Sequence, residues 1–176
     1  MIITISGRQD AGKTTLAKKL AEKLNYDFIS IGDLRGMIAQ EHNMIIDELN
    51  DIGKKEKWVH VEADKKTIEI GKTRDNFIVE GWAAWHFIPH SKKIFLDVDQ
   101  NVGTKRVFIN QRPDEKPCKN IKEMQDLLDL RLKVTDEALK KYYNINFLDK
   151  QNYDIIIDST NLSIEEMVNT TIEKLK

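Results

Sequence analysis

The chain has 176 residues, of which 40% are hydrophobic and 32% charged, and its net charge is −1. This composition is typical of a soluble globular protein, and the length fits a single domain over residues 1–176. The near-zero charge excludes a basic surface for duplex nucleic acid and a polybasic patch for membranes.

Cysteine usage and hydropathy indicate the compartment. Cys118 is the single cysteine, which excludes an internal disulfide and is typical of the reducing cytoplasm. No apolar run approaches the ~20 residues that are needed to span a bilayer. Because an apolar segment begins directly after Met1, we expect no signal peptide and a cytoplasmic monomer.

The first predicted elements enclose a phosphate-binding pattern. Residues 2–5 form an apolar run that indicates a buried strand, and residues 15–24 place their leucines on one helical face. Between them, residues 7–14 read Gly-x4-Gly-Lys-Thr. Backbone N–H groups and the positive helix end are expected to bind phosphates, Lys13 to reach the β and γ phosphates, and Thr14 to bind Mg²⁺. The residues expected to contact ATP are Gly7, Arg8, Gln9, Asp10, Ala11, Gly12, Lys13, Thr14 and Thr15.

Four further strands are predicted from short apolar runs. They cover residues 27–30, 76–80, 94–97 and 153–158. Three of them end in an acid, at Glu80, Asp97 and Asp158. Since strands alternate with helical segments, we predict a parallel α/β sheet with its ligands at the carboxyl ends of the strands.

Helical segments fill the intervals between these strands. Several helices are expected between residues 32 and 72, with Gly53 and Gly71 as their boundaries. A helix starts near Gln100, and Asp97 and Asp99 are expected to cap it. An irregular stretch at 110–117 separates it from a long helix at 121–143. Ser163 and Glu166 form a capping box that opens the last helix.

Other phosphate-loop classes lack support. The guanine-reading Asn-Lys-x-Asp segment of GTPases is missing, no Asp-x-x-Gly switch follows a strand, and motor ATPases need more chain. The size and the helical insert after the second strand resemble nucleoside monophosphate kinases, closest to the short archaeal type of cytidylate kinase. The segments that carry this resemblance are 29–33, 79–81, 93–96, Arg106, Arg131, 143–146 and 153–158.

The resemblance implies a three-layer P-loop kinase fold with a five-stranded parallel sheet. It implies a helical acceptor-binding region at about 32–73 and a mobile lid at about 108–135. The expected reaction is transfer of a phosphoryl group from ATP-Mg²⁺ to a small nucleoside monophosphate. Arginines that close over the γ phosphate are the expected catalysts. The predicted catalytic residues are Lys13, Arg106, Arg112 and Arg131, and Arg106 and Arg131 also match the family pattern.

The acceptor side departs from the family pattern. The substrate-binding residues implied are Asp33, Arg35, Asp64, Glu80, Gly81 and Trp82. A family arginine falls here on Gly36, while Arg35 stands one place earlier, and one helical step turns a side chain by about 100°. The family's Glu-Gly-Arg ends here in Trp82, which replaces a bidentate phosphate donor by an uncharged ring.

A similar departure affects the lid. The family runs Arg-x3-Asp-x2-Arg-Tyr, and after Arg131 these positions hold Thr135, Ala138 and Leu139. They are associated in the family with cytosine and phosphate contacts, so we predict a CMP- or dCMP-like acceptor with altered or broadened specificity. Arg35, the only arginine between Arg8 and Arg74, is predicted to carry most of the acceptor-phosphate recognition.

Several residues admit two interpretations. Trp82 and Trp85 either stack on a base or pack in the core, and Arg8 either adds a positive charge in cis or is an ordinary loop residue. Asp158 either adjoins the donor base or forms a turn. His86 and His90 have metal-like spacing, but Pro89 interrupts any helix that would align them.

Two other functions fit the altered arginines. One is a P-loop kinase that acts on another small molecule or on a nucleic-acid end, although the chain lacks a basic groove for polynucleotides. The other is a nucleotide-binding regulatory protein with weak turnover, although the intact Lys13-Thr14 pair opposes complete loss of activity.

Overall fold

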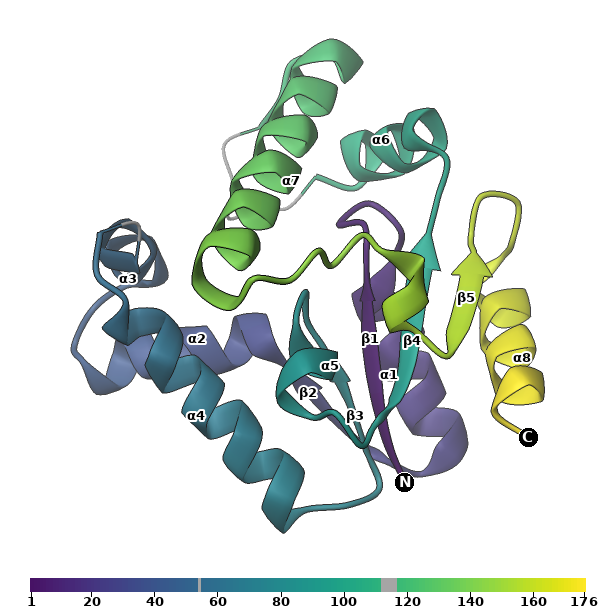
Figure 1. Cartoon of the computed structure of the whole chain (residues 1–176). Coiled ribbons are helices and arrows are strands. Elements are labelled where there is room, and N and C mark those ends of the chain that lie inside the picture. The colour runs from purple at the N-terminus through teal and green to yellow at the C-terminus, as the bar shows by residue number, and fades with distance from the viewer. Residues whose placement is uncertain (54, 112–116) are drawn as a thin grey trace.

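The computed structural model describes residues 1–53, 55–111 and 117–176 and has a parallel sheet at its centre (Figure 1). The strands are β1 (Ile2–Gly7), β2 (Asp27–Ser30), β3 (Phe77–Glu80), β4 (Lys92–Asp97) and β5 (Ile155–Asp158). Their order in the sheet is β2-β3-β1-β4-β5, and every neighbouring pair is parallel. All carboxyl ends therefore meet at one edge. The predicted five-stranded parallel α/β sheet is confirmed.

The bounds of four strands differ from the prediction. β1 ends two residues later, at Gly7, and β3 begins one residue later, at Phe77. β4 begins two residues earlier because Lys92 and Lys93 already pair with Ile3 and Thr4 of β1. A polar start of this kind is hidden from a search for apolar runs. β5 begins two residues later, at Ile155.

Helices cover both faces of the sheet. On one face, α1 (Lys13–Leu24) and α8 (Ile164–Leu175) pack on β1, β4 and β5 through buried aliphatic side chains such as Leu16, Leu20 and Val168. On the other face, Phe77 and Val79 pack with the short helix α5 (Ala84–Phe87) and with Ile70. Burying both faces gives the three layers that were predicted.

Three helices follow β2, as predicted for the helical insert. They are α2 (Ile31–Glu41), α3 (Ile46–Gly53) and α4 (Trp58–Thr73), and they share a core of Ile38, Ala39, Leu49, Val59 and Ala63. Gly53 ends α3 as expected. Gly71, however, lies inside α4 and does not end it, so that prediction is wrong. A Cβ atom at Gly71 would lie 2.9 Å from the Ile88 side chain, and this close packing accounts for the glycine.

Two helices lie beyond the carboxyl ends of the strands (Figure 1). They are α6 (Gln100–Ile109) and α7 (Ile121–Tyr143), and α7 has the predicted bounds. Asp99 caps α6, because its Oδ1 accepts from the backbone N–H groups of Asn101 and Val102. The prediction that Asp97 is also a cap is wrong, since Asp97 instead forms an ion pair of 2.6 Å with Lys150 in the 3-10 turn η1 (Lys150–Asn152).

The last helix begins as the sequence predicts. Ser163 and Glu166 form a reciprocal capping box, in which Ser163 Oγ accepts from Glu166 N and the Glu166 carboxylate accepts from Ser163 N. Met167 and Val168 are buried, whereas Ile164 is exposed. Among the helices that the structure describes, none is long and apolar enough to cross a bilayer.

Candidate active site

The loop after β1 has the backbone shape of an anion cradle. Gly7 and Gly12 have φ values of 136° and 87°, which only glycine adopts readily. A Cβ atom at Gly7 would lie 2.0 Å from the carbonyl oxygen of Leu96, whereas one at Gly12 would meet nothing within 4 Å. The first glycine therefore lets the loop leave the sheet beside β4. The second leaves open space at the N-terminal end of α1, where the helix favours an anion.

Lys13 is held at the centre of this loop. Its ammonium group donates to the carbonyl oxygen of Arg8 at 2.8 Å and lies 4.8 Å from the centroid of the Trp82 ring. The residue is only 5% exposed. A nearly desolvated cation of this kind interacts strongly with an anion that enters the cradle.

A second contact joins the loop to β3. Thr14 Oγ1 donates to Glu80 Oε2 at 3.2 Å, and Ser6 Oγ donates to the carbonyl oxygen of Gly81 at 2.7 Å. A hydroxyl oxygen beside a carboxylate oxygen is the kind of donor set that Mg²⁺ prefers. The residues present therefore fit the Mg²⁺ that the sequence pattern implies. Within the described ranges, no cluster of three or more His, Cys, Asp or Glu side chains suited to a metal occurs.

Gln9 and Thr15 are two more of the residues that were predicted to contact ATP. The Gln9 amide donates to the carbonyl oxygen of Leu128 at 2.9 Å, so the phosphate loop is attached to the middle of α7. Thr15 is exposed on the first turn of α1.

Arg8 and Asp10 form an ion pair within the loop, of which only Asp10 is buried. Arg8 Nε lies 3.5 Å from Asp10 Oδ1, and Asp10 is 4% exposed. Neither Asp10 oxygen accepts a hydrogen bond from the part of the chain that the structure describes. The carboxylate packs on α6, where a Cβ atom at Gly103 would lie 2.4 Å from Asp10 Oδ2. Burial raises the pKa of Asp10, and the positive charge of Arg8 opposes this effect.

The segment after β5 contacts the phosphate loop through Ser159, a contact that the sequence did not predict. Ser159 is fully buried, and its hydroxyl group lies within hydrogen-bond distance of the carbonyl oxygens of Ala11 and Asp97. Asp158 Oδ1 accepts from the backbone N–H and the hydroxyl of Thr160, which is an ordinary turn. A serine after a strand carries no distinctive pattern, so only the fold reveals this contact.

The three predicted catalytic arginines have different surroundings. Arg106 donates to the carbonyl oxygens of Ser159 and Thr160, both at 3.0 Å, and therefore holds the segment after β5. Arg131 lies on α7 and is partly exposed. Arg112 falls outside the described residues. Their catalytic roles stay predictions.

The predicted acceptor residues lie on α2, on α4 and after β3. Asp33 is exposed in the first turn of α2, and Gly81 is buried where a Cβ atom would lie 2.5 Å from Ile31. Arg35 and Asp64 are half-buried and close enough for their charges to interact. Burial lowers the pKa of Arg35, and the charge of Asp64 opposes this effect.

The two tryptophans near the acceptor residues differ in burial. Trp85 is buried in an aromatic cluster with Tyr153, which favours core packing over stacking on a base. Trp82 is half-buried between Lys13 and Phe147, and its ring meets the Phe147 ring edge-on at 5.0 Å.

Tyr143 is a member of this region that the sequence interpretation missed. Its hydroxyl donates to Asp64 Oδ2 at 2.5 Å across 79 positions of the chain. The Tyr142-Tyr143 pair is also compatible with plain helix packing, so the sequence contains no signal that separates the two roles.

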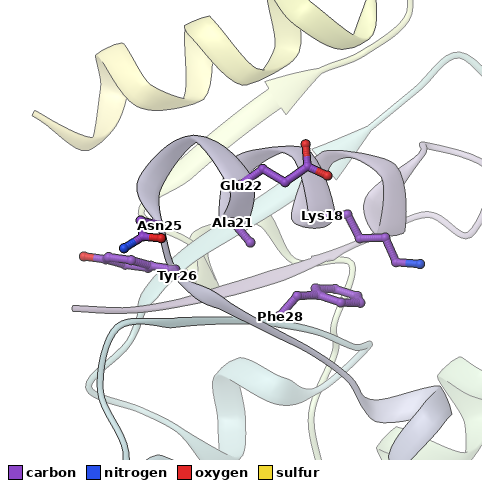
Figure 2. A pocket seen from close by; sticks show the side chains of 6 residues that line it. All are labelled: Lys18, Ala21, Glu22, Asn25, Tyr26 and Phe28. Atoms are coloured by element: carbon purple, nitrogen blue, oxygen red, sulfur yellow. The ribbon is translucent and has the colours of Figure 1, made fainter.

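A shallow hollow lies at the other end of α1 (Figure 2). It has a volume of about 350 Å³ and is open to solvent, with Lys18, Glu22, Tyr26 and Phe28 among its lining residues. None of the predicted site residues lines it.

Known proteins resemble this chain over nearly its whole length. The sequence profile of the cytidylate kinase-like family matches residues 2–161. A cytidylate kinase of Methanosphaera stadtmanae is 31% identical over 172 residues, which are 96% of this chain and 94% of the relative. An S-adenosylmethionine-dependent nucleotide dehydratase of Lacinutrix mariniflava is 27% identical over 97% of this chain, but the chain spans only 35% of that longer protein.

Solved structures show the same fold. A shikimate kinase from Bacteroides thetaiotaomicron superposes with a TM-score of 0.69 at 22% identity, over 99% of this chain and 98% of that structure. An uncharacterized protein from Eubacterium ventriosum superposes with a TM-score of 0.76 at 19% identity, over 98% and 96% of the two chains. At this identity the likeness establishes the fold alone, which is that of a P-loop kinase.

Proposed function

We propose that this chain, which belongs to the cytidylate kinase-like family, transfers the γ-phosphoryl group of ATP to a nucleoside monophosphate of the CMP or dCMP type. Family and fold together make it a nucleotide kinase. The finer assignment, to a monophosphate acceptor and to a pyrimidine, is the proposal.

The observation that carries the proposal is the arrangement of Lys13, Thr14 and Glu80. A nearly buried ammonium group lies at the loop centre, and a hydroxyl oxygen and a carboxylate oxygen lie 3.2 Å apart beside it. These groups gather where β1 and β3 end, the place where parallel α/β sheets bind ligands. Phosphoryl transfer consists mostly of positioning and charge stabilisation, which such an arrangement provides.

In this proposal the donor and the acceptor enter from different elements. ATP binds along residues 7–15, with Lys13 at its β and γ phosphates, and Mg²⁺ held near Thr14 supplies charge neutralisation on the phosphates. The acceptor binds between the helical region at 32–73 and the end of β3. The segment at about 108–135 acts as the lid, from which Arg131 and Arg112 reach the transferred group and exclude water.

The acceptor class is supported by two further facts. A monophosphate oxygen is already ionised near neutral pH, so transfer to this acceptor does not require a general base. The relative from Lacinutrix mariniflava is named as a nucleotide dehydratase, so a segment similar to this chain occurs in a protein named for nucleotide chemistry.

A coupled assay of ADP formation tests the proposal. ATP and Mg²⁺ are supplied with CMP, dCMP, UMP, dTMP, AMP, GMP or shikimate, one acceptor at a time. Rapid turnover with a pyrimidine monophosphate supports the proposal. Turnover with shikimate alone assigns another kinase of the same fold. Tight ATP binding without turnover assigns the regulatory alternative.

A further inference from the structure

A hydrogen bond joins the end of α7 to the middle of the helical insert. Tyr143 is the last residue of α7, and its hydroxyl donates to Oδ2 of Asp64 on α4 at 2.5 Å. In Figure 1 the lower end of α7 lies close to the helical insert. Asp64 belongs to the helical region that, in the proposed function, binds the acceptor, and Tyr143 ends the helix whose first half belongs to the proposed lid.

The Asp64 carboxylate has three positively charged or titratable neighbours besides Tyr143. Arg35 faces it from α2, His60 lies one turn earlier on α4, and His86 approaches from α5. Burial raises the pKa of Asp64, and the hydrogen bond from Tyr143 and these charges oppose the rise. Burial also raises the pKa of Tyr143, so its hydroxyl remains a donor at neutral pH.

The hydrogen bonds of Asp64 leave one oxygen available. Tyr143 donates to Oδ2, and among the described residues no donor reaches Oδ1. Asp64 is half-buried and not sealed in the core. An ionised carboxylate is an acceptor only, with about four lone-pair sites. The side chain is therefore fixed on one side by Tyr143 and free on the other to accept from a ligand.

Aromatic residues connect this carboxylate to the phosphate loop. Tyr143 packs edge-on against Phe87 at 5.2 Å, and Tyr143, Phe87, Phe147 and Trp82 belong to one cluster. Trp82, at the other end of the cluster, lies over Lys13. Phe147 is fully buried, whereas Trp82, Phe87 and Tyr143 are partly exposed, so these three rings can line a ligand that extends from the phosphate loop to Asp64.

We propose that Asp64 is the base-reading residue of the acceptor site, and that its carboxylate accepts a hydrogen bond from the exocyclic amino group of cytosine. Tyr143 is the positioning residue that fixes the carboxylate. This inference rests on the proposed function and specifies the base.

The chemistry distinguishes cytosine from uracil. Cytosine presents an amino donor at its N4 position, which a carboxylate accepts. Uracil presents a carbonyl acceptor at the same place, so two acceptors would face each other and both would lose their hydrogen bonds to water. Tyr143 cannot repair this mismatch, because its hydroxyl proton is already donated to Asp64. Adenine also carries an exocyclic amino group, and its larger ring system makes AMP a separate test of pocket size.

The experiment compares CMP with UMP in three proteins. They are the wild type, Asp64→Asn and the matched control Glu69→Gln, which changes an exposed carboxylate on the same helix. The wild type should prefer CMP over UMP in kcat/KM, since one correct base contact discriminates by at least about tenfold. In Asp64→Asn the amide can turn an N–H toward uracil, so the ratio should fall by about tenfold or more. The control should keep the wild-type ratio.

Tyr143→Phe separates reading from positioning. It removes the hydrogen bond but keeps the ring in the aromatic cluster, so the CMP-to-UMP ratio should fall by a smaller factor while the KM for ATP stays unchanged. If Asp64→Asn lowers kcat/KM equally for CMP and UMP, Asp64 acts only on Arg35 and the inference is overturned. A wild type that prefers UMP also overturns it.

Binding of CMP and UMP, measured by calorimetry, tests the inference even if the enzyme shows no turnover or the variant does not fold. If no monophosphate is phosphorylated, the proposed function fails. The base site still stands if wild-type protein binds CMP at least about tenfold more tightly than UMP. If Asp64→Asn does not fold, a CMP analogue with hydrogen in place of the amino group replaces the variant. Equal binding of CMP and this analogue contradicts the assignment, and weaker binding of the analogue supports it.

Discussion

The contact between Lys13 and Trp82 gives a prediction whose size follows from the structure. The ammonium group lies 4.8 Å from the ring centroid, and Lys13 is 5% exposed. Trp82 also stands where the family has an arginine, so the contact is a feature of this chain. We expect the two side chains to stabilise each other in the protein without nucleotide.

The magnitude depends on the desolvation of the lysine. A cation over an aromatic ring within about 6 Å contributes about 0.5–1 kcal/mol when exposed and about 2 kcal/mol when desolvated. Since Lys13 is almost buried, we expect a coupling free energy of about 1–2 kcal/mol between the two side chains. When ATP-Mg²⁺ binds, the ammonium group moves onto the phosphates, and this coupling should largely disappear.

A double-mutant cycle measures this coupling. The free energy of unfolding in urea is determined for the wild type, Lys13→Met, Trp82→Leu and the double variant, each with and without ATP-Mg²⁺. Lys18 over Phe28 supplies a matched control pair at 5.6 Å, with an exposed lysine outside the site. Its coupling should be about 0.5 kcal/mol or less and independent of nucleotide.

Two outcomes would refute the reasoning. A coupling below about 0.3 kcal/mol for Lys13 and Trp82 is within ordinary additivity and would mean that the ring does not stabilise the cation. An unchanged coupling in saturating ATP-Mg²⁺ would mean that Lys13 does not move to the phosphates.

Four further variants test single residues. Arg35→Ala should raise the KM for the acceptor strongly and leave ATP binding nearly unchanged, which steady-state kinetics with each substrate varied in turn will measure. An equal rise in the KM values for ATP and for the acceptor would contradict the role of Arg35 in binding the acceptor. Arg131→Ala should lower kcat about 10³-fold while ATP affinity stays near normal. Arg106→Ala should also raise the KM for ATP, because it removes the hydrogen bonds that Arg106 donates to the segment after β5. Stopped-flow ATP binding together with kcat separates the effects of these two variants. Burial raises the pKa of Asp10 above its ordinary 3.8, so the protonated carboxyl stabilises the fold at pH values below 3.8, and this stabilisation is lost as the pH rises through the folded pKa. The free energy of unfolding of Asp10→Asn in urea should therefore rise relative to that of the wild type from about pH 4 toward neutrality. A difference that does not change with pH would refute the charge-burial explanation.

The sequence predicted the elements whose pattern is local. The strand, glycine loop and helix around Lys13, the bounds of α7 and the capping box at Ser163 all follow from periodicity and local hydrogen bonding. Family membership was also predicted from motifs in their order and is confirmed.

The remaining features depend on contacts between distant segments. Gly71 is explained by Ile88 and not by a helix end, and the four residues of α5 are too few for a periodic pattern. The bond between Tyr143 and Asp64 depends on where α7 ends relative to α4, which no local pattern encodes. Asp10 is buried against Gly103 of α6 for the same reason.

Transfer of a labelled γ phosphate is the most direct test of the central claim. ATP labelled at the γ position is incubated with CMP and Mg²⁺, and the products are separated for the wild type and for Lys13→Ala. We expect label in CDP for the wild type and transfer slower by a factor on the order of 10² or more for Lys13→Ala, because the variant lacks the charge that stabilises the transferring phosphoryl group. Label found only in inorganic phosphate, or equal transfer by the two proteins, would contradict the central claim.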